Sequence, residues 1–150
     1  MECGLRFYFG RMVRVPSAPS AALGYGSAVH NTLWKTVDVG HPKQQWPDES
    51  AFIALFETEL FKQRGAFTPA GYMLKLDQGR ERLPQYYRSR LPIWQSDKGK
   101  EIILEKWLES SIDGIKIGGK ADKIIVENDQ VIVIDYKTGK PENADASFSP

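Results

Sequence analysis

Two aspartates and a lysine stand beside strongly apolar segments in the second half of the chain. Asp135 and Lys137 directly follow the apolar run 131–134, and Asp122 lies in the apolar segment before it. Carboxylate oxygens are the ligands that Mg²⁺ and Mn²⁺ prefer, and a lysine ammonium can balance the charge of a phosphate. These residue types therefore point to metal-assisted chemistry on a phosphate ester.

The spacing of these residues predicts that they share one side of a sheet. Asn128 and Asp129 are typical of a two-residue hairpin turn. With that turn, Asp122 faces Asp135 directly, with Cβ atoms roughly 5 Å apart. Lys137 lies on the same side because side chains alternate along a strand. Facing carboxylates repel each other, so a cation between them would remove an unfavourable contact.

Other turns and simpler explanations stay open. A three-residue turn would move the pairing by one position and separate the two aspartates, whereas a four-residue turn with the same centre would keep it. Taken alone, Asp135-x-Lys137 is better explained as a strand end with a lysine in solvent. The second aspartate, expected opposite the first, favours a site.

A histidine in the first half of the chain is a further candidate. The helix expected over residues 21–37 is rich in small residues, namely Ala21, Ala22, Gly24, Gly26, Ser27 and Ala28. Glycine costs a helix about 1 kcal/mol relative to alanine, so this composition indicates a close approach of the helix to the sheet. His30 lies one turn after Gly26 and could reach a site there. By itself, His30 is better explained as a packed or surface histidine.

The order of expected elements predicts an α+β fold, with N-terminal helices followed by an antiparallel three-strand meander. Helices are expected over residues 5–14, over residues 21–37, from Asp48 or Ser50 through Phe61, and from Thr68-Pro69 with a break or kink near Gly79 and Pro84. Strands are expected over residues 101–109, 115–127 and 130–137. Because residues 131–134 show no polar alternation, we expect the last strand to be central, with helices packed on it.

Composition limits the class of protein. A chain of 150 residues, 41% apolar and 26% charged, fits a single domain over residues 1–150. No segment has the length and apolarity of a membrane span or a secretion signal, and the single cysteine, Cys3, suits a reducing, cytoplasmic location.

The net charge of +1 does not announce a nucleic-acid partner. Two arginine clusters are better explained, each alone, as solvated helix faces: Arg6, Arg11 and Arg14, and Arg80, Arg82, Arg88 and Arg90. An aromatic platform for base stacking among Phe7, Tyr8, Phe9 and Tyr25 is explained equally well by core packing.

Three motifs occur in a family-specific order: Gly26-x-x-x-His30, Gly119-x-x-Asp122 and Asp135-Tyr136-Lys137-Thr138-Gly139-Lys140. Together they resemble the RecB-like branch of the PD-(D/E)XK nuclease superfamily, in particular nuclease domains found alone or fused to UvrD-like helicases. The opening Cys3-Gly4-Leu5-Arg6-Phe7-Tyr8 is similar to that family's first helix. The resemblance spans about residues 2–143 and implies a restriction-endonuclease-like core.

The resemblance also implies roles for the motif residues. Asp122 and Asp135 would bind the metal through their carboxylates, with His30 and the backbone carbonyl of Tyr136 as further ligands. Lys137 would orient or activate the attacking water and stabilise charge on the phosphate. Glu105 resembles an acidic position that supports the metal site in some members, although an exposed strand glutamate is its default interpretation.

The activity implied is that of a Mg²⁺- or Mn²⁺-dependent deoxyribonuclease that hydrolyses phosphodiester bonds. The resemblance suggests exonuclease action in DNA repair or recombination, with DNA and a helicase domain or subunit as partners and no membrane. The alternative is a catalytically inactive DNA- or protein-binding module of the same fold. The intact Asp122, Asp135 and Lys137 favour the enzyme.

Two departures from the family pattern matter. The family core continues with a helix carrying Gln-x-x-x-Tyr and a further strand, and neither occurs here. We therefore expect a domain truncated at its C-terminal end, whose own activity stays open. Some relatives also hold an iron–sulfur cluster through four cysteines. Cys3 cannot build such a site alone, so no iron–sulfur cluster is expected within this chain.

Overall fold

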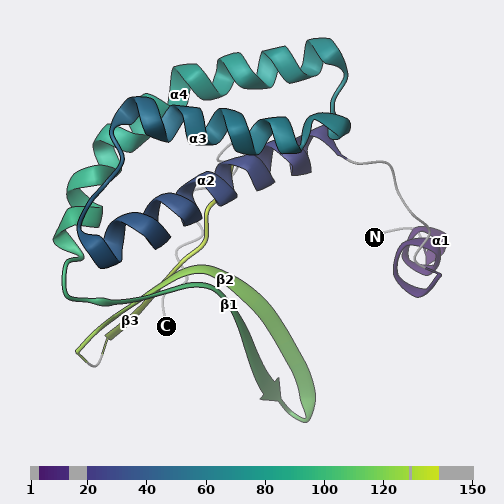
Figure 1. Cartoon of the computed structure of the whole chain (residues 1–150). Coiled ribbons are helices and arrows are strands. Elements are labelled where there is room, and N and C mark those ends of the chain that lie inside the picture. Colours follow the sequence, from purple (N-terminus) through teal and green to yellow (C-terminus); the bar gives the residue numbers. More distant parts are fainter. Residues whose placement is uncertain (1–3, 14–19, 129, 139–150) are drawn as a thin grey trace.

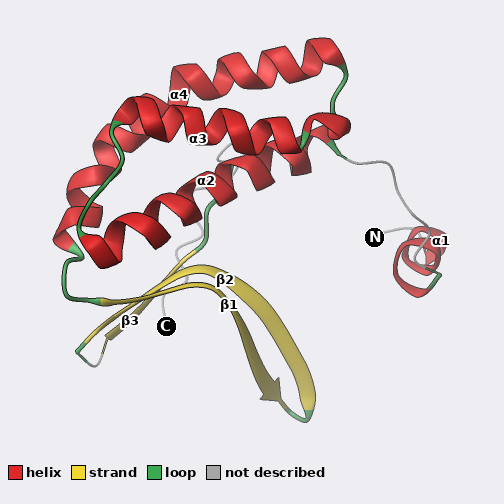
Figure 2. Ribbon diagram, in the orientation of Figure 1, coloured by secondary structure: helices red, strands yellow, loops and turns green. Residues whose placement is uncertain are grey.

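The computed structural model describes residues 4–13, 20–128 and 130–138, in which the three long helices form a layer on one side of an antiparallel sheet (Figures 1 and 2). The helices are α1 (Gly4–Phe7), a π-helical turn η1 (Tyr8–Met12), α2 (Ala21–Lys43), α3 (Glu49–Lys62), a 3₁₀ turn η2 (Arg64–Ala66) and α4 (Pro69–Ser96). The strands are β1 (Glu101–Ile112), β2 (Ile115–Glu127) and β3 (Gln130–Ile134). The expected α+β order is confirmed.

The starts of α3 and α4 follow from their capping residues. The Asp48 carboxylate accepts a hydrogen bond from the Ala51 amide at 2.7 Å, and the Thr68 hydroxyl accepts one from Gly71 at 3.1 Å. Each cap satisfies an amide that the first helical turn leaves without a partner. Pro69 occupies the first turn, where its missing N–H costs nothing.

One helix boundary expected from the sequence was wrong. Helix α2 does not end near residue 37 but continues through Pro42 to Lys43. Its last turns are held by packing: a Cβ built on the buried Gly40 would lie 2.5 Å from the ring of Trp46. Helix α4 was expected to break or kink near Gly79 and Pro84. It runs without a break through both residues, and Figure 1 shows that it changes direction along its length. Among the described helices, none is both long and apolar enough to cross a membrane.

Gly79 is a contact point between helices rather than a helix end. A Cβ built there would lie 2.1 Å from Cε1 of Phe56, so the α3 ring occupies the space that a side chain would need. Phe56 is fully buried in the core that α2, α3 and α4 share. The described core of this bundle includes Leu33, Val37, Phe52, Phe56, Leu60, Leu83, Tyr87 and Trp94.

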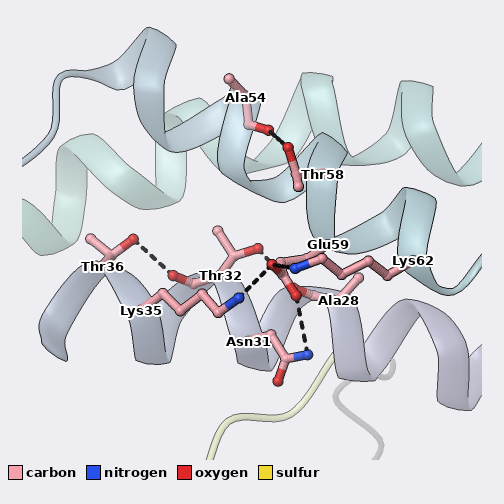
Figure 3. Close-up of polar contacts among 9 residues, drawn as sticks. All are labelled: Ala28, Asn31, Thr32, Lys35, Thr36, Ala54, Thr58, Glu59 and Lys62. Atoms are coloured by element: carbon pink, nitrogen blue, oxygen red, sulfur yellow. Dashed lines mark hydrogen bonds and ion pairs between the residues drawn. The ribbon is translucent and has the colours of Figure 1, made fainter. Parts of the chain in front are cut away.

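A polar cluster joins α2 to α3 inside this bundle (Figure 3). The Glu59 carboxylate, 2% exposed, accepts hydrogen bonds from Lys35 at 2.7 Å and Lys62 at 2.6 Å. The Asn31 amide donates a third at 3.4 Å. The buried charge is therefore paired on both sides, as a charge in a protein interior requires.

The sheet has the order β1-β2-β3, and its register confirms the hairpin turn expected at Asn128 and Asp129. The β2–β3 pairs run from Lys123↔Ile134 to Glu127↔Gln130, which is the pairing that a two-residue turn dictates. Asp129 itself lies outside the described residues, as does Cys3.

Strand β3 differs from expectation in length and position. It ends at Ile134, so Asp135 and Lys137 follow the strand instead of belonging to it. It lies at an edge of the described sheet, with Val131 63% and Val133 57% exposed, so the expected central, covered strand was wrong. An apolar run reports a preference for extended backbone, whereas strand order depends on topology that the run does not encode.

Candidate active site

Asp122 of β2 is a buried carboxylate engaged through both oxygens. Its Oδ1 lies 3.3 Å from Nδ1 of His30, and its Oδ2 accepts a hydrogen bond from the backbone N–H of Tyr136 at 2.7 Å. The second contact joins β2 to the segment after β3, because Asp122 and Tyr136 both lie just beyond the last ladder pair, Lys123↔Ile134. The Asp122 side chain is therefore held in one orientation, with Oδ1 directed at α2.

His30 reaches Asp122 because α2 passes close to the segment after β3. A Cβ built on Gly26, one turn before His30, would lie 3.4 Å from the Thr138 hydroxyl oxygen. The His30 ring meets the ring of Tyr136 edge to face, with centroids 6.0 Å apart. The close approach suggested by the small residues of α2 is thus present, and it brings the histidine to the sheet.

Asp135 and Lys137 form a second pair next to the first. Lys137 Nζ lies 2.6 Å from Oδ2 of Asp135, and both side chains are exposed. The hydrogen bond to Asp135, followed by the charge of that carboxylate, raises the pKa of Lys137 above its usual value. Lys137 is therefore a cation under ordinary conditions, fixed beside a carboxylate that it neutralises.

The four motif side chains are thus brought to one place as two pairs, not as one cluster. Asp122 and Asp135 do not face each other in the ladder, because β3 ends one pair too early. Asp122 contacts His30, and Asp135 contacts Lys137. Among the described residues, no group of three or more His, Cys, Asp or Glu side chains is placed to hold a metal ion.

Glu105 occupies the position opposite Asp122 on β1, but its side chain makes another contact. The neighbouring pairs Leu104↔Lys123 and Lys106↔Ala121 flank it, and Glu105 itself drops out of the ladder with φ +55°. Residues other than glycine rarely adopt this conformation. Its carboxylate forms an ion pair with Lys120. No residue pattern in this part of the chain indicated the interruption.

Tyr136 contributes its amide and its ring. The amide holds Asp122, while the half-buried ring packs against the helical core. Burial, with the nearby Tyr86 and Asp122, raises the pKa of the Tyr136 hydroxyl well above its ordinary range. The hydroxyl therefore stays protonated at neutral pH.

A cavity of about 580 Å³ opens beside this constellation. Asp135, Tyr136 and Lys137 line one side of it, while Arg82 and Arg90 of α4 line another. Sequence reasoning treated those arginines as a solvated face and assigned them no role. The signal that could have found them is their spacing of two helical turns, which puts both on one face.

A buried ion pair, also missed from the sequence, lies at the cavity wall. Lys123 Nζ donates to Asp97 Oδ2 at 2.9 Å, and both side chains are almost completely buried. The pair joins β2 to the end of α4, next to Asp122. The only sign of this ion pair in the sequence is that a lysine occurs within the largely apolar segment 121–126.

Comparison with known proteins adds a family match. The model of a family described as the PD-(D/E)XK nuclease superfamily matches residues 1–149, which include all of the motif residues described above. No curated protein and no solved structure matches the chain.

Proposed function

The chain belongs to the PD-(D/E)XK nuclease superfamily, and on this premise we propose that it is a metal-dependent nuclease acting on DNA. The observation that carries the proposal is the contact between His30 and Asp122, 3.3 Å apart, beside the Asp135–Lys137 pair. A nitrogen and an oxygen that can both bind a cation therefore lie next to each other. A carboxylate and an ammonium stand next to it.

The His30–Asp122 separation fits two ligands of one small divalent cation. Adjacent ligands of Mg²⁺, each at about 2.1 Å in octahedral geometry, lie about 3 Å apart. The N–H of Tyr136 holds the other Asp122 oxygen, as hydrogen bonds commonly orient metal ligands. We propose that Asp135, turned away from Lys137, and the Tyr136 carbonyl complete the set for Mg²⁺ or Mn²⁺.

The bound cation would polarise a phosphate oxygen and lower the pKa of a water molecule, which is the chemistry that this reaction needs. Lys137 would supply the positive charge that stabilises the negative charge developing on the phosphate. If Asp135 held the cation, the Lys137 ammonium would lose its partner and could contact the phosphate and the attacking water. Glu105, opposite Asp122, is proposed as a supporting acid.

The finer parts of the proposal rest on the order of the sequence motifs. The Gly26-x-x-x-His30 element followed by Asp135-Tyr136-Lys137 resembles the RecB-like branch. We therefore propose exonuclease action in DNA repair or recombination, together with a helicase domain or subunit. A cytoplasmic location is proposed because the single cysteine, Cys3, suits a reducing compartment.

A second candidate is a catalytically inactive module that binds DNA or protein. The observation that favours it is the side-chain arrangement itself, because the described residues hold no three-ligand metal group. Under this alternative, Asp135 stays paired with Lys137 and the chain binds DNA without cutting it.

Cleavage of a labelled DNA strand in the presence of Mn²⁺ separates the two. We expect Lys137→Ala to slow cleavage by about 10²–10³-fold, the usual cost of losing one group that stabilises transition-state charge. Lys116→Ala, which removes an exposed lysine of β2, is the matched control and should cleave normally. Unchanged cleavage by Lys137→Ala would refute the catalytic role, and wild-type DNA binding without cleavage would establish the inactive module.

A further inference from the structure

The four arginines of α4 divide into two pairs with different surroundings. Arg80 and Arg88 face α3, where Arg80 pairs with Glu57 at 2.6 Å and Arg88 pairs with Glu49 at 2.5 Å. Two helical turns separate these arginines, so they lie on one face of α4. The carboxylates of α3 therefore neutralise the charges of Arg80 and Arg88.

Arg82 and Arg90 lie on a different face of α4, with Tyr86 between them at steps of four residues. All three line the cavity. Within the described part of the chain, neither arginine forms an ion pair with a carboxylate, and the Arg90 guanidinium lies 5.5 Å from the centre of the Tyr86 ring. As far as the described residues go, the helix thus presents to the cavity two cations without a carboxylate partner and an aromatic ring.

The remaining charges around the cavity cancel. Asp97 is paired with Lys123, and Asp135 is paired with Lys137. The net charge that a ligand would meet is therefore the positive charge of Arg82 and Arg90. An electropositive cavity beside the proposed active site fits a phosphate-bearing ligand.

The volume and the lining residues of the cavity narrow the class of ligand further. A volume of about 580 Å³ lies in the range of small-molecule sites and is large enough for one nucleotide. Tyr25, Tyr86 and Tyr136 are among the residues that line it, and an aromatic side chain can stack on a base. A duplex keeps its bases inside its stack and cannot place one here unless the base is flipped out.

We propose that this cavity binds one nucleotide of a single-stranded DNA, with Arg82 and Arg90 holding the flanking phosphates. The inference rests on the proposed function in that it places the bound strand against Asp135 and Lys137, where the adjoining phosphodiester would be cut. Arg82, Tyr86 and Arg90 are then positioning residues that select a single strand over a duplex.

The test is DNA binding in EDTA, so that neither metal nor cleavage contributes. Fluorescence anisotropy would compare a labelled oligothymidylate with a blunt duplex of equal length over a series of salt concentrations. The variant Arg82→Gln/Arg90→Gln is matched with Arg80→Gln/Arg88→Gln, which removes the same charge from the same helix. Circular dichroism melting would show that both variants fold.

The cavity variant, Arg82→Gln/Arg90→Gln, should lose two phosphate contacts on a single strand. We expect the slope of log affinity against log salt concentration to become shallower by about 1.4, and the affinity at 0.1 M salt to fall roughly 25-fold. The control variant should keep the wild-type slope. Equal losses in both variants, equal affinity of the wild type for the duplex, or no binding of the single strand would each overturn the proposal. If the cavity variant alone loses binding while no cleavage is ever found, the nuclease proposal fails and this inference stands.

Discussion

Replacing Glu59 by glutamine removes a buried negative charge that two lysines share. The carboxylate is 2% exposed and accepts hydrogen bonds from Lys35 and Lys62 (Figure 3). Burial raises the pKa of Glu59, but the hydrogen bonds from the two lysines outweigh burial, and the net pKa is lowered from 4.5. The folded state therefore favours the ionised form, which is a contribution to the free energy of unfolding.

The sign of the pH effect follows from this direction. A carboxyl group with a lowered folded-state pKa stabilises the fold at every pH above its unfolded value, near 4.5. That stabilisation disappears as the pH falls through the lower folded value. Glu59→Gln lacks the group, so the difference in stability between wild type and variant should be largest at neutral pH and should narrow in acid.

The expected cost at pH 7 is about 2 kcal/mol. Removing one partner of a fully buried ion pair costs roughly 3–5 kcal/mol, but the Lys35 and Lys62 side chains are 33% and 52% exposed and can regain water. The lower range, that of hydrogen bonds to charged groups at about 1.5–3 kcal/mol, therefore applies.

Urea unfolding at pH 7 and pH 3.5 measures this effect. Glu57→Gln is the matched control, because it makes the same change two residues away in an exposed pair with Arg80. Such surface pairs contribute about 0–1 kcal/mol. If Glu59→Gln costs no more than Glu57→Gln at pH 7, or if its cost is the same at both pH values, the reasoning from burial is wrong.

Two further substitutions test the packing around the site by the same unfolding measurements. Gly79→Ala should destabilise the fold by about 1–3 kcal/mol, because its Cβ would meet the Phe56 ring at 2.1 Å. Gly65→Ala, whose Cβ would have nothing within 4 Å, is the control and should have little effect. Equal stabilities of the two variants would contradict the α3–α4 contact. Lys123→Met should cost about 3 kcal/mol because it leaves Asp97 buried without its main partner, and a loss below 1 kcal/mol would show that the pair is hydrated.

Local chemistry accounts for the parts of the fold that the sequence predicted. Asp48 and Thr68 were recognisable as caps because their side chains satisfy amides within their own first turn. The β2–β3 register followed from the length of the turn at Asn128, since a hairpin turn fixes every later pair. Both signals act over a few residues.

Tertiary packing accounts for the parts that sequence reasoning missed. Gly79 was expected to mark a break or kink, but the Phe56 ring that occupies the space beside it comes from another helix. The arginines of α4 looked alike, and only α3 distinguishes Arg80 from Arg82 by supplying a carboxylate to the first.

The candidate site was predictable in its residues and not in its contacts. The register placed Asp122 and Asp135 near each other, yet the orientation of each carboxylate depends on a partner from elsewhere. His30 arrives from α2 to meet Asp122, and Lys137 holds Asp135. Glu105 leaves the ladder through a backbone conformation that no residue pattern announced.

The most direct test of the metal-dependent account is a calorimetric titration of Mn²⁺ into the chain, into Asp122→Asn and into Asp113→Asn. Asparagine keeps the shape of Asp122 and its hydrogen bond from the Tyr136 N–H, but it removes the charge that a cation needs. Asp113, in the exposed β1–β2 turn, is the control. We expect saturable Mn²⁺ binding by the wild type and by Asp113→Asn, and no such binding by Asp122→Asn. A folded wild type that takes up no Mn²⁺, or unchanged binding by Asp122→Asn, would contradict it.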